Sequence, residues 1–287
     1  AEVQRLASHL MWLGAFGPDI GNLTLMTWCL RDREMFLDLL QELGGSRMHY
    51  NYPRVGGVKR DIPIGWANRL KAKVKLFENR INEYEMLLDE STIWLVRLQG
   101  VGYATAEDQL NAGVTGPNIR AAGVNTDARW TNPYSVYDQV DWEPAVEKPT
   151  SVKGADCYDR YRVRMEEMRQ STHIINQCVA WLKENPGPVM SDDHKVTPPD
   201  REDMKGDMES LIHHFKLFTE GFCLPEGESY TAVEAPKGEF GVYLVSDGAN
   251  KPYRVKIRAP GFAHLAAMDE MAKGLSLIHI SEPTRPY

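Results

Sequence analysis

Apolar residues recur at helical spacing along most of the chain. The clearest stripe advances in steps of three or four residues, with lysine and glutamate on the other faces, and its members are Leu70, Val74, Phe77, Ile81, Tyr84 and Leu88. This pattern is typical of a helix with one buried seam inside a bundle. Comparable stripes predict helices over about residues 1–15, 23–43 and 156–183, and one more after Pro198 and Pro199.

Two strands follow these helices. Residues 240–246 and 253–258 are predicted as strands, because Gly and Pro interrupt the chain before the first and residues 247–250 connect the two tightly. A short helix over residues 263–273 completes the pattern. The predicted fold is mostly α, of the α+β kind, with a helical bundle core and a small antiparallel β-sheet. No linker is visible, so residues 1–274 are predicted to form a single domain.

Composition narrows the classes of function. The net charge of −7 over 287 residues argues against nucleic acid as the main partner. The four cysteines form no C-x-x-C pair, which indicates neither a disulfide framework nor a zinc site. Residues 6–30 are the most apolar region, but polar and helix-breaking residues that a membrane span tolerates poorly interrupt it: His9, Pro18, Asp19 and Asn22. We expect buried helices there, and peripheral attachment to a membrane complex stays open.

The motifs give no support for catalysis by this chain alone. The sequence has no P-loop, no G-x-G-x-x-G after a strand, no H-E-x-x-H and no G-x-S-x-G, so no catalytic residue and no metal ligand is assigned. His213 and His214 point about 100° apart on a helix and cannot share a metal on one face. Arg160, Arg164 and Glu167 lie on nearby turns, which predicts a solvated or ion-paired face, with a subunit interface as the alternative.

Two polar residues have informative local settings. Asp19 lies in GPDIGN, an apolar stretch between two predicted helices. It either caps the second helix or is a buried carboxylate that needs a partner. His49 lies in a loop punctuated by Gly and Pro, where a histidine is usually at the surface or satisfied within the core. The residues alone leave these alternatives open.

Three runs of sequence resemble one known family. They are SLIHHFKLFTEGF at residues 210–222, EAPKGEFGVYLVSDG at residues 234–248 and RVKIRAPGFAHL at residues 254–265. Together they are similar to the 49 kDa, or D, subunit family of respiratory complex I, which is related to the large subunit of NiFe hydrogenases. The likeness runs from about residue 1 to Gly274 and implies a hydrogenase-large-subunit-like fold.

The resemblance also implies a function. The chain would be the quinone-site subunit of a proton-translocating NADH:quinone oxidoreductase, and it would line the quinone cavity beside the terminal iron–sulfur cluster of a partner subunit. Quinone would be the substrate, and this chain would ligate no cofactor and be inactive in isolation. The implied partners are other complex I subunits, including the cluster-bearing subunit and the membrane arm. The implied location is peripheral, on the cytoplasmic face of the plasma membrane or the matrix side of a mitochondrial inner membrane.

Positions that match the family imply particular site residues. The residues implied for the quinone cavity are Met11, Asp19, Met26 and Leu30, of which Met26 and Leu30 stand where many relatives have Phe. A basic residue, Met and His, followed by Arg-x-Gly-Gly-Val, match the family motif within residues 47–58. This match implies His49 as a neighbour of the cluster and Arg54 as a charge close to it. A titratable imidazole beside a cluster tunes its potential and couples that potential to pH.

Two other functions stay open. The large subunit of a membrane-bound NiFe hydrogenase, or a subunit of an F420H2 dehydrogenase, shares much of this pattern, although a hydrogenase needs C-x-x-C pairs near both ends. A helical scaffold protein without a redox role is the other possibility. The chain starts within a helical pattern and the family pattern stops at Gly274, so we expect a fragment that lacks both ends and carries a non-native tail over residues 275–287.

Overall fold

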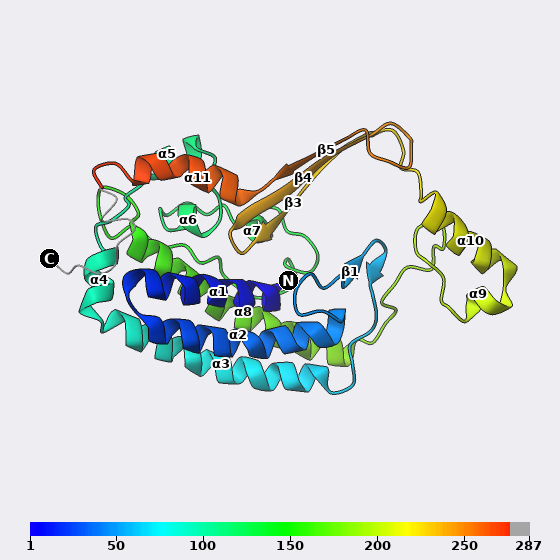
Figure 1. Cartoon of the computed structure of the whole chain (residues 1–287), viewed down its shortest axis with the longest axis horizontal. Helices are drawn as coiled ribbons and strands as arrows, with labels where there is room; N and C mark the ends of the chain where they lie inside the picture. The colour runs from blue at the N-terminus through cyan, green and yellow to red at the C-terminus, as the bar shows by residue number, and fades with distance from the viewer. Residues whose placement is uncertain (276–287) are drawn as a thin grey trace.

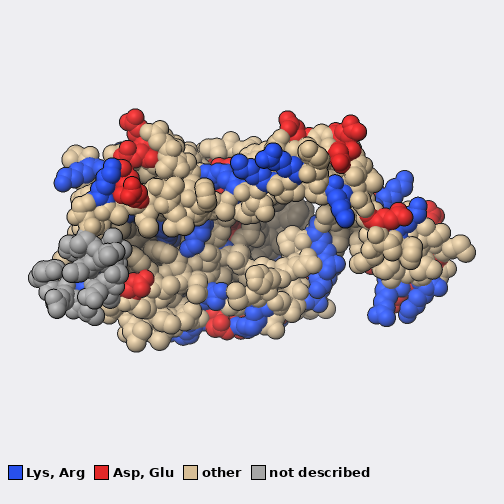
Figure 2. Space-filling model, turned by 45° about the horizontal axis from the view of Figure 1, so that its top comes forward, with Lys and Arg blue, Asp and Glu red and all other residues tan. Residues whose placement is uncertain are grey.

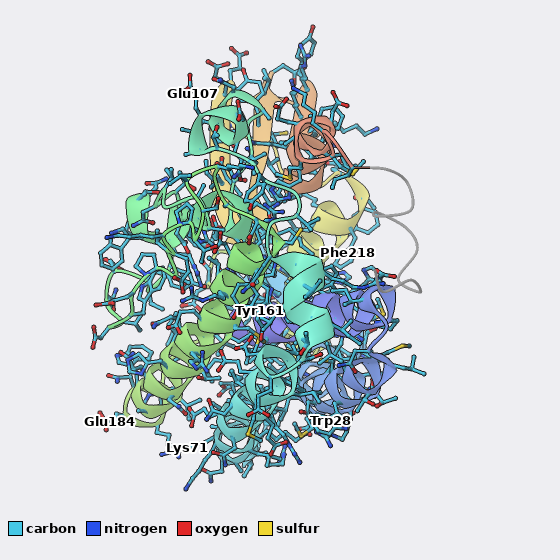
Figure 3. The ribbon with its side chains drawn as sticks, turned by 90° about the vertical axis from the view of Figure 1, so that its left-hand side faces the viewer. Trp28, Lys71, Glu107, Tyr161, Glu184 and Phe218 are labelled. Atoms are coloured by element: carbon cyan, nitrogen blue, oxygen red, sulfur yellow. The ribbon has the colours of Figure 1, made fainter. Side chains whose placement is uncertain are left out.

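Four long helices lie side by side in the computed structural model, which describes residues 1–275 (Figure 1). They are α1 (Glu2–Ile20), α2 (Leu23–Gly44), α3 (Trp66–Asp89) and α8 (Cys157–Glu184). Each helix buries one face against its neighbours, and the apolar side chains between them form the main core. Figure 3 looks along this bundle, with Tyr161 inside it and Lys71 at its outer surface. The predicted tail lies outside the described residues from residue 276 onward.

The connection between α1 and α2 is short and well capped. Gly21 takes a left-handed conformation, with φ 99°, that ends α1. Asn22 caps α2 by accepting a hydrogen bond from the backbone N–H of Leu25. The prediction that Pro18 and Asp19 interrupt the first helix is wrong, because α1 continues through both residues. A proline this close to the end of a helix removes one backbone hydrogen bond and leaves few turns to disturb.

Close packing holds the bundle together. At Gly14 of α1, an added Cβ would lie 3.1 Å from the Cβ of Cys29, so a glycine lets α2 approach. The predicted stripe of α3 is buried along its whole length, as expected. Within it, Phe77 meets Phe36 of α2 edge to face, with 5.1 Å between ring centroids. In the region 6–30, Leu6, Leu10, Leu13 and Leu25 are likewise buried, and no helix within residues 1–275 is long and apolar enough to cross a membrane.

Short helices lie between α3 and α8 in the sequence. They are α4 (Thr92–Leu98), α5 (Ala106–Asn111), α6 (Pro117–Arg120) and α7 (Ala128–Thr131). Thr105 caps α5 by accepting a hydrogen bond from the N–H of Asp108. At the start of α8, the side chains of Asp156 and Asp159 each accept a hydrogen bond from the other's backbone N–H.

A three-stranded antiparallel sheet forms the second part of the fold. Its strands, in spatial order, are β3 (Gly227–Ala235), β4 (Gly238–Ser246) and β5 (Arg254–Arg258). β4 and β5 confirm the two predicted strands, whereas β3 has no counterpart in the prediction. The last helix, α11 (Pro260–Met271), confirms the predicted C-terminal helix. A separate two-stranded hairpin pairs β1 (Pro53–Arg54) with β2 (Gly57–Val58).

The predicted fifth long helix differs from the structure. It is divided into α9 (Asp203–Gly206) and α10 (Met208–Thr219), which lie at the far end of the sheet and away from the bundle (Figure 1). Its apolar stripe faces solvent, and Phe218 is 72% exposed. On the face drawn in Figure 2, basic and acidic side chains are interspersed among wide uncharged areas. The predicted class, mostly α with small antiparallel sheets, is confirmed.

Candidate functional site

The residues implied for the quinone cavity lie on one helical hairpin. Met11 and Asp19 belong to α1, and Met26 and Leu30 belong to α2. Met11 is 48% exposed, Met26 is 38% exposed and Leu30 is half-buried. Met26 lies against α1, since its backbone is close to Gly14. The structure therefore brings these side chains to the outer side of the α1–α2 hairpin, and we call the four residues the α1–α2 surface.

The structure contradicts both interpretations of Asp19 that its local sequence suggested, a helix cap and a buried carboxylate. It lies in the last turn of α1 and is exposed, so it is not a carboxylate buried in an apolar setting. It does not cap the second helix either, because Asn22 does so. Within the described part of the chain, its carboxylate accepts no hydrogen bond and forms no ion pair. Asp19 is therefore a free acidic group at the edge of an otherwise apolar surface.

His49 and Arg54 lie at the other end of α2. His49 is exposed in the loop that follows this helix, and its φ of 55° is uncommon for a residue other than glycine. Arg47 holds the start of the loop through ion pairs with Glu34 and Asp38 of α2. Since an α-helix rises about 1.5 Å per residue, some 20 Å of α2 separates this loop from the α1–α2 surface. The structure does not bring the two predicted groups together.

Arg54 lines an apolar groove between the β1–β2 hairpin and α10. The groove has a volume of about 440 Å³, and its walls include Val55, Phe218, Phe222 and Leu244. The guanidinium of Arg54 is exposed and makes no ion pair within residues 1–275. The groove is formed by segments that are far apart in the sequence, so no local sequence pattern predicted it.

A network of buried ion pairs joins the bundle to the sheet. Arg120 of α6 is fully buried and pairs with Asp127, with Glu167 of α8 and with Glu234 of β3, the last at 2.8 Å. Glu167 also accepts a hydrogen bond of 2.7 Å from Nε2 of His9, which lies on α1. One guanidinium thus connects three segments that are distant in the sequence.

Glu2 forms the second centre of this network. Arg129 of α7 pairs with Asp127 at 2.7 Å and with Glu2 at 3.2 Å. Glu2 also accepts a hydrogen bond of 2.5 Å from the hydroxyl of Tyr137 and one of 2.6 Å from Ser171 of α8. Its neighbour Arg5 donates to the backbone carbonyl of Glu234 at 2.6 Å. We call Glu2, Arg5, His9, Arg120, Asp127, Arg129, Glu167 and Glu234 the ionic network.

Burial and pairing act in opposite directions on these groups. Burial raises the pKa of Glu2, but Arg5 and Arg129 overcome this effect and lower that pKa to about 2. Burial lowers the pKa of His9 to about 4, although the hydrogen bond with Glu167 opposes the shift. His9 is therefore a neutral imidazole at pH 7 and donates through Nε2, while its buried Nδ1 has no partner among the described residues. Burial is also the main cause of the raised pKa of Glu234.

The predicted face at Arg160, Arg164 and Glu167 is buried instead of solvated. Glu167 is ion-paired, as one form of the prediction stated. Within residues 1–275, the two arginines have no carboxylate partner and bind neutral acceptors: Arg160 donates to the carbonyl of Gly102, and Arg164 to the side chain of Asn118, each at 2.8 Å. The correction has a simple cause, because the chain between α3 and α8 covers this face of α8.

Sequence reasoning missed the ionic network. Its members are spread along the chain, and Arg5 and Glu234 are 229 positions apart. The one local signal is the placement of Glu2, Arg5 and His9 among the buried apolar positions of α1. No cluster of His, Cys, Asp and Glu that could hold a metal occurs among the described residues, and the cysteines are free.

Comparison with known proteins gives consistent matches. Residues 19–281 match the family described as respiratory-chain NADH dehydrogenase, 49 kDa subunit. The D subunit of NADH-quinone oxidoreductase from Nitrosococcus oceani is 52% identical over 97% of this chain and 72% of its own length. The protein of the same name from Ruthia magnifica is 54% identical over 95% of this chain and 70% of its own length. That of Chromobacterium violaceum is 52% identical, with 96% and 70% covered.

These matches define the chain as a subunit of a respiratory oxidoreductase complex. The chain belongs to the 49 kDa, or D, subunit family of NADH-quinone oxidoreductase, complex I of the respiratory chain. The family expected from the sequence is confirmed. Membership in a multi-subunit complex also means that other complex I subunits are its partners.

Replacing Arg120 with Met tests the ionic network. The substitution leaves Glu167, Glu234 and Asp127 without their shared counter-charge, so the free energy of unfolding should fall by about 3–5 kcal/mol. Urea denaturation of the full chain, followed by circular dichroism, measures the change. Arg47→Met is the control, because Arg47 forms exposed ion pairs, and exposed pairs contribute little to stability. Equal losses in the two variants would contradict a structural role for the network.

The pKa of His9 predicts acid sensitivity. Its pKa is about 4 in the folded chain and near 6.5 in the unfolded chain, so only the unfolded chain binds a proton between these values. Stability is complete above pH 6.5 and falls as the pH drops towards 4, by about 3 kcal/mol in all. Urea denaturation at a series of pH values measures this slope. His9→Gln should flatten it over that range, and an unchanged slope would show that other groups cause it.

Proposed function

We propose that this chain lines the quinone cavity of a proton-translocating NADH:quinone oxidoreductase, next to the terminal iron–sulfur cluster of a partner subunit. The observation that carries this proposal is the α1–α2 surface. Met11 and Met26 are exposed there although both are apolar, and Leu30 is only half-buried. A quinone ring and its isoprenoid tail are apolar, and such a surface offers them contacts without a cost in desolvation.

The free carboxylate of Asp19 also supports this proposal. Asp19 lies on the same helical hairpin, with a carboxylate that no described residue engages. Reduction of a quinone takes up two protons, and a carboxyl group near the headgroup can take up a proton from solvent and donate it to a quinone oxygen. An apolar surface with one free acidic group is the composition expected for one wall of such a cavity.

The buried cysteine Cys29 is unsuited to ligate a cluster, which supports a cluster held by the partner subunit. Cys29 is buried between α1 and α2, where burial, with a smaller effect of Asp32, raises the pKa of its thiol to about 12. A cluster ligand must be a thiolate, so Cys29 is a poor one. His49 and Arg54, by contrast, are exposed and free to approach a cluster held by another subunit. His49 would place an imidazole near this cluster, and Arg54 would place a positive charge near it.

A peripheral location fits the same arrangement. We propose that the chain attaches to the cytoplasmic face of the membrane, or to the matrix side in a mitochondrion, through contacts with the cluster-bearing subunit and the membrane arm. Exposed apolar side chains on α10 and α11 support such contacts, since these helices leave large parts of Phe218 and Leu265 uncovered.

Met26→Lys tests the quinone role. A lysine on the α1–α2 surface must be desolvated when quinone binds, which costs about 1–3 kcal/mol and should raise the KM for quinone roughly tenfold or more. Steady-state assays of the complete complex measure this KM, with reduction of the clusters by NADH as the internal reference. Met86→Lys is the matched control, because Met86 is an exposed methionine on α3. The same KM in both variants would exclude the α1–α2 surface from the cavity.

His49→Met tests the assignment beside the cluster. If the imidazole takes up a proton when the cluster is reduced, the midpoint potential of the cluster falls by about 59 mV for each unit by which the pH rises. The variant should lose this dependence, as measured by redox titration of the complete complex with electron paramagnetic resonance. His173→Met, an exposed position on α8, should keep it. An unchanged pH dependence in His49→Met would remove His49 from the cluster's surroundings.

A further inference from the structure

Four basic residues from four elements converge where the sheet meets α8 and α11. They are Arg164 of α8, Lys237 in the turn between β3 and β4, Arg258 at the end of β5 and His264 of α11. We call this group the cationic cluster. It is distinct from the ionic network, and neither the α1–α2 surface nor the loop of His49 includes any of its members.

Thr115 holds the cationic cluster together. Its carbonyl oxygen accepts a hydrogen bond of 3.0 Å from Nε2 of His264, and its hydroxyl oxygen accepts one of 3.4 Å from Arg258. The β3–β4 turn sits directly on the next residue, because a Cβ added at Gly116 would lie 2.4 Å from the Cα of Gly238. The positions of these basic groups are therefore set by tight backbone packing.

The cationic cluster contains no carboxylate partner within residues 1–275. Arg164 is 91% buried, yet it donates to a backbone carbonyl and to the amide of Asn118, and its Nε has no partner. The ammonium of Lys237 forms no ion pair either. The carboxylate of Glu239, in the adjacent strand position, accepts a hydrogen bond from Tyr230 at 2.7 Å. By contrast, Arg120 and Arg129 of the ionic network each pair with carboxylates.

The basic groups of the cationic cluster lower one another's pKa values. Burial, followed by the charge of Arg160, lowers the pKa of Arg164 to about 10, and the carboxylate of Glu167, about one turn along α8, opposes this shift only in part. Lys237 reaches solvent, but protein surrounds enough of its side chain that desolvation, followed by Arg164, lowers its pKa to about 8. Burial lowers the pKa of His264, and Arg164, Arg258 and Lys237 add to that effect. Cations brought together without a counter-charge are destabilising, and an added anion would relieve that cost.

We propose that the cationic cluster receives an acidic side chain of a neighbouring subunit, so that it is an electrostatic docking point for a protein partner. The surrounding surface favours a protein over a free anion. On α11, Phe262 is 84% exposed and Leu265 is 68% exposed, and an inorganic anion would leave both uncovered. Apolar side chains around a specific charge contact are typical of subunit interfaces. The inference rests on membership in a multi-subunit complex and is independent of the quinone role.

Charge variants of Lys237 in the complete complex test this docking point. Lys237→Glu puts an acid opposite the partner's acid, so release of this subunit should become at least about tenfold faster, whereas Lys237→Arg should behave like the unchanged protein. The release rate is measured by native electrophoresis after dilution at a series of NaCl concentrations. Lys251→Glu is the matched control, because Lys251 is an exposed lysine in the β4–β5 turn of the same sheet.

Two results would overturn the proposal. The first is an equal release rate for Lys237→Glu and Lys251→Glu, which would show that the cationic cluster contacts no partner charge. The second is slower release of the unchanged subunit on addition of inorganic phosphate at constant ionic strength, which would show that a free anion fills the cluster. Both readouts are dissociation rates, so failure of the quinone assignment would not affect them.

Discussion

A charge buried without a counter-charge is strongly destabilising, and this constraint organises the whole molecule. Glu2 and Arg5 on α1, Glu167 on α8, the arginines of α6 and α7, and Glu234 on β3 all lie in the interior. None of these charged groups is tolerated there unless the others are in place. The ionic network therefore sets the position of the sheet relative to the bundle. The β3–β4 turn, three residues beyond Glu234, is thereby held against the loop at Gly116.

Charged and apolar side chains find partners in the interior of this chain, but many of those at its surface do not. Inside, the acidic and basic groups of the ionic network are paired, and the apolar stripes of α1, α2, α3 and α8 cover one another. Outside, α10 and α11 present large apolar side chains to solvent, and no member of the cationic cluster forms an ion pair with a carboxylate within residues 1–275. A chain that folds alone and works alone would not keep both features. They are reasonable in a subunit whose outer surfaces become interiors when a complex assembles.

The sequence predicts most of the bundle and little of the site. Helical stripes such as that of α3 repeat locally, and caps such as Thr105 act over three residues, so local patterns are sufficient to find them. β3 was missed because residues on both of its faces are exposed, which removes the alternation that marks a strand. The pairing of Arg120 with Glu234 was missed because ion pairs between distant segments leave no periodic trace.

Asp19 shows why a site at an interface resists prediction from one chain. Its apolar sequence neighbours suggested burial, yet the helix turns those neighbours inward and leaves the carboxylate in solvent. The same geometry exposes Met11 and Met26, whose side chains would belong in a core if polarity alone decided their position. Their surroundings depend on atoms that other subunits supply. Residue types therefore carry information about the assembled complex, while the fold of the single chain determines only which of them reach its surface.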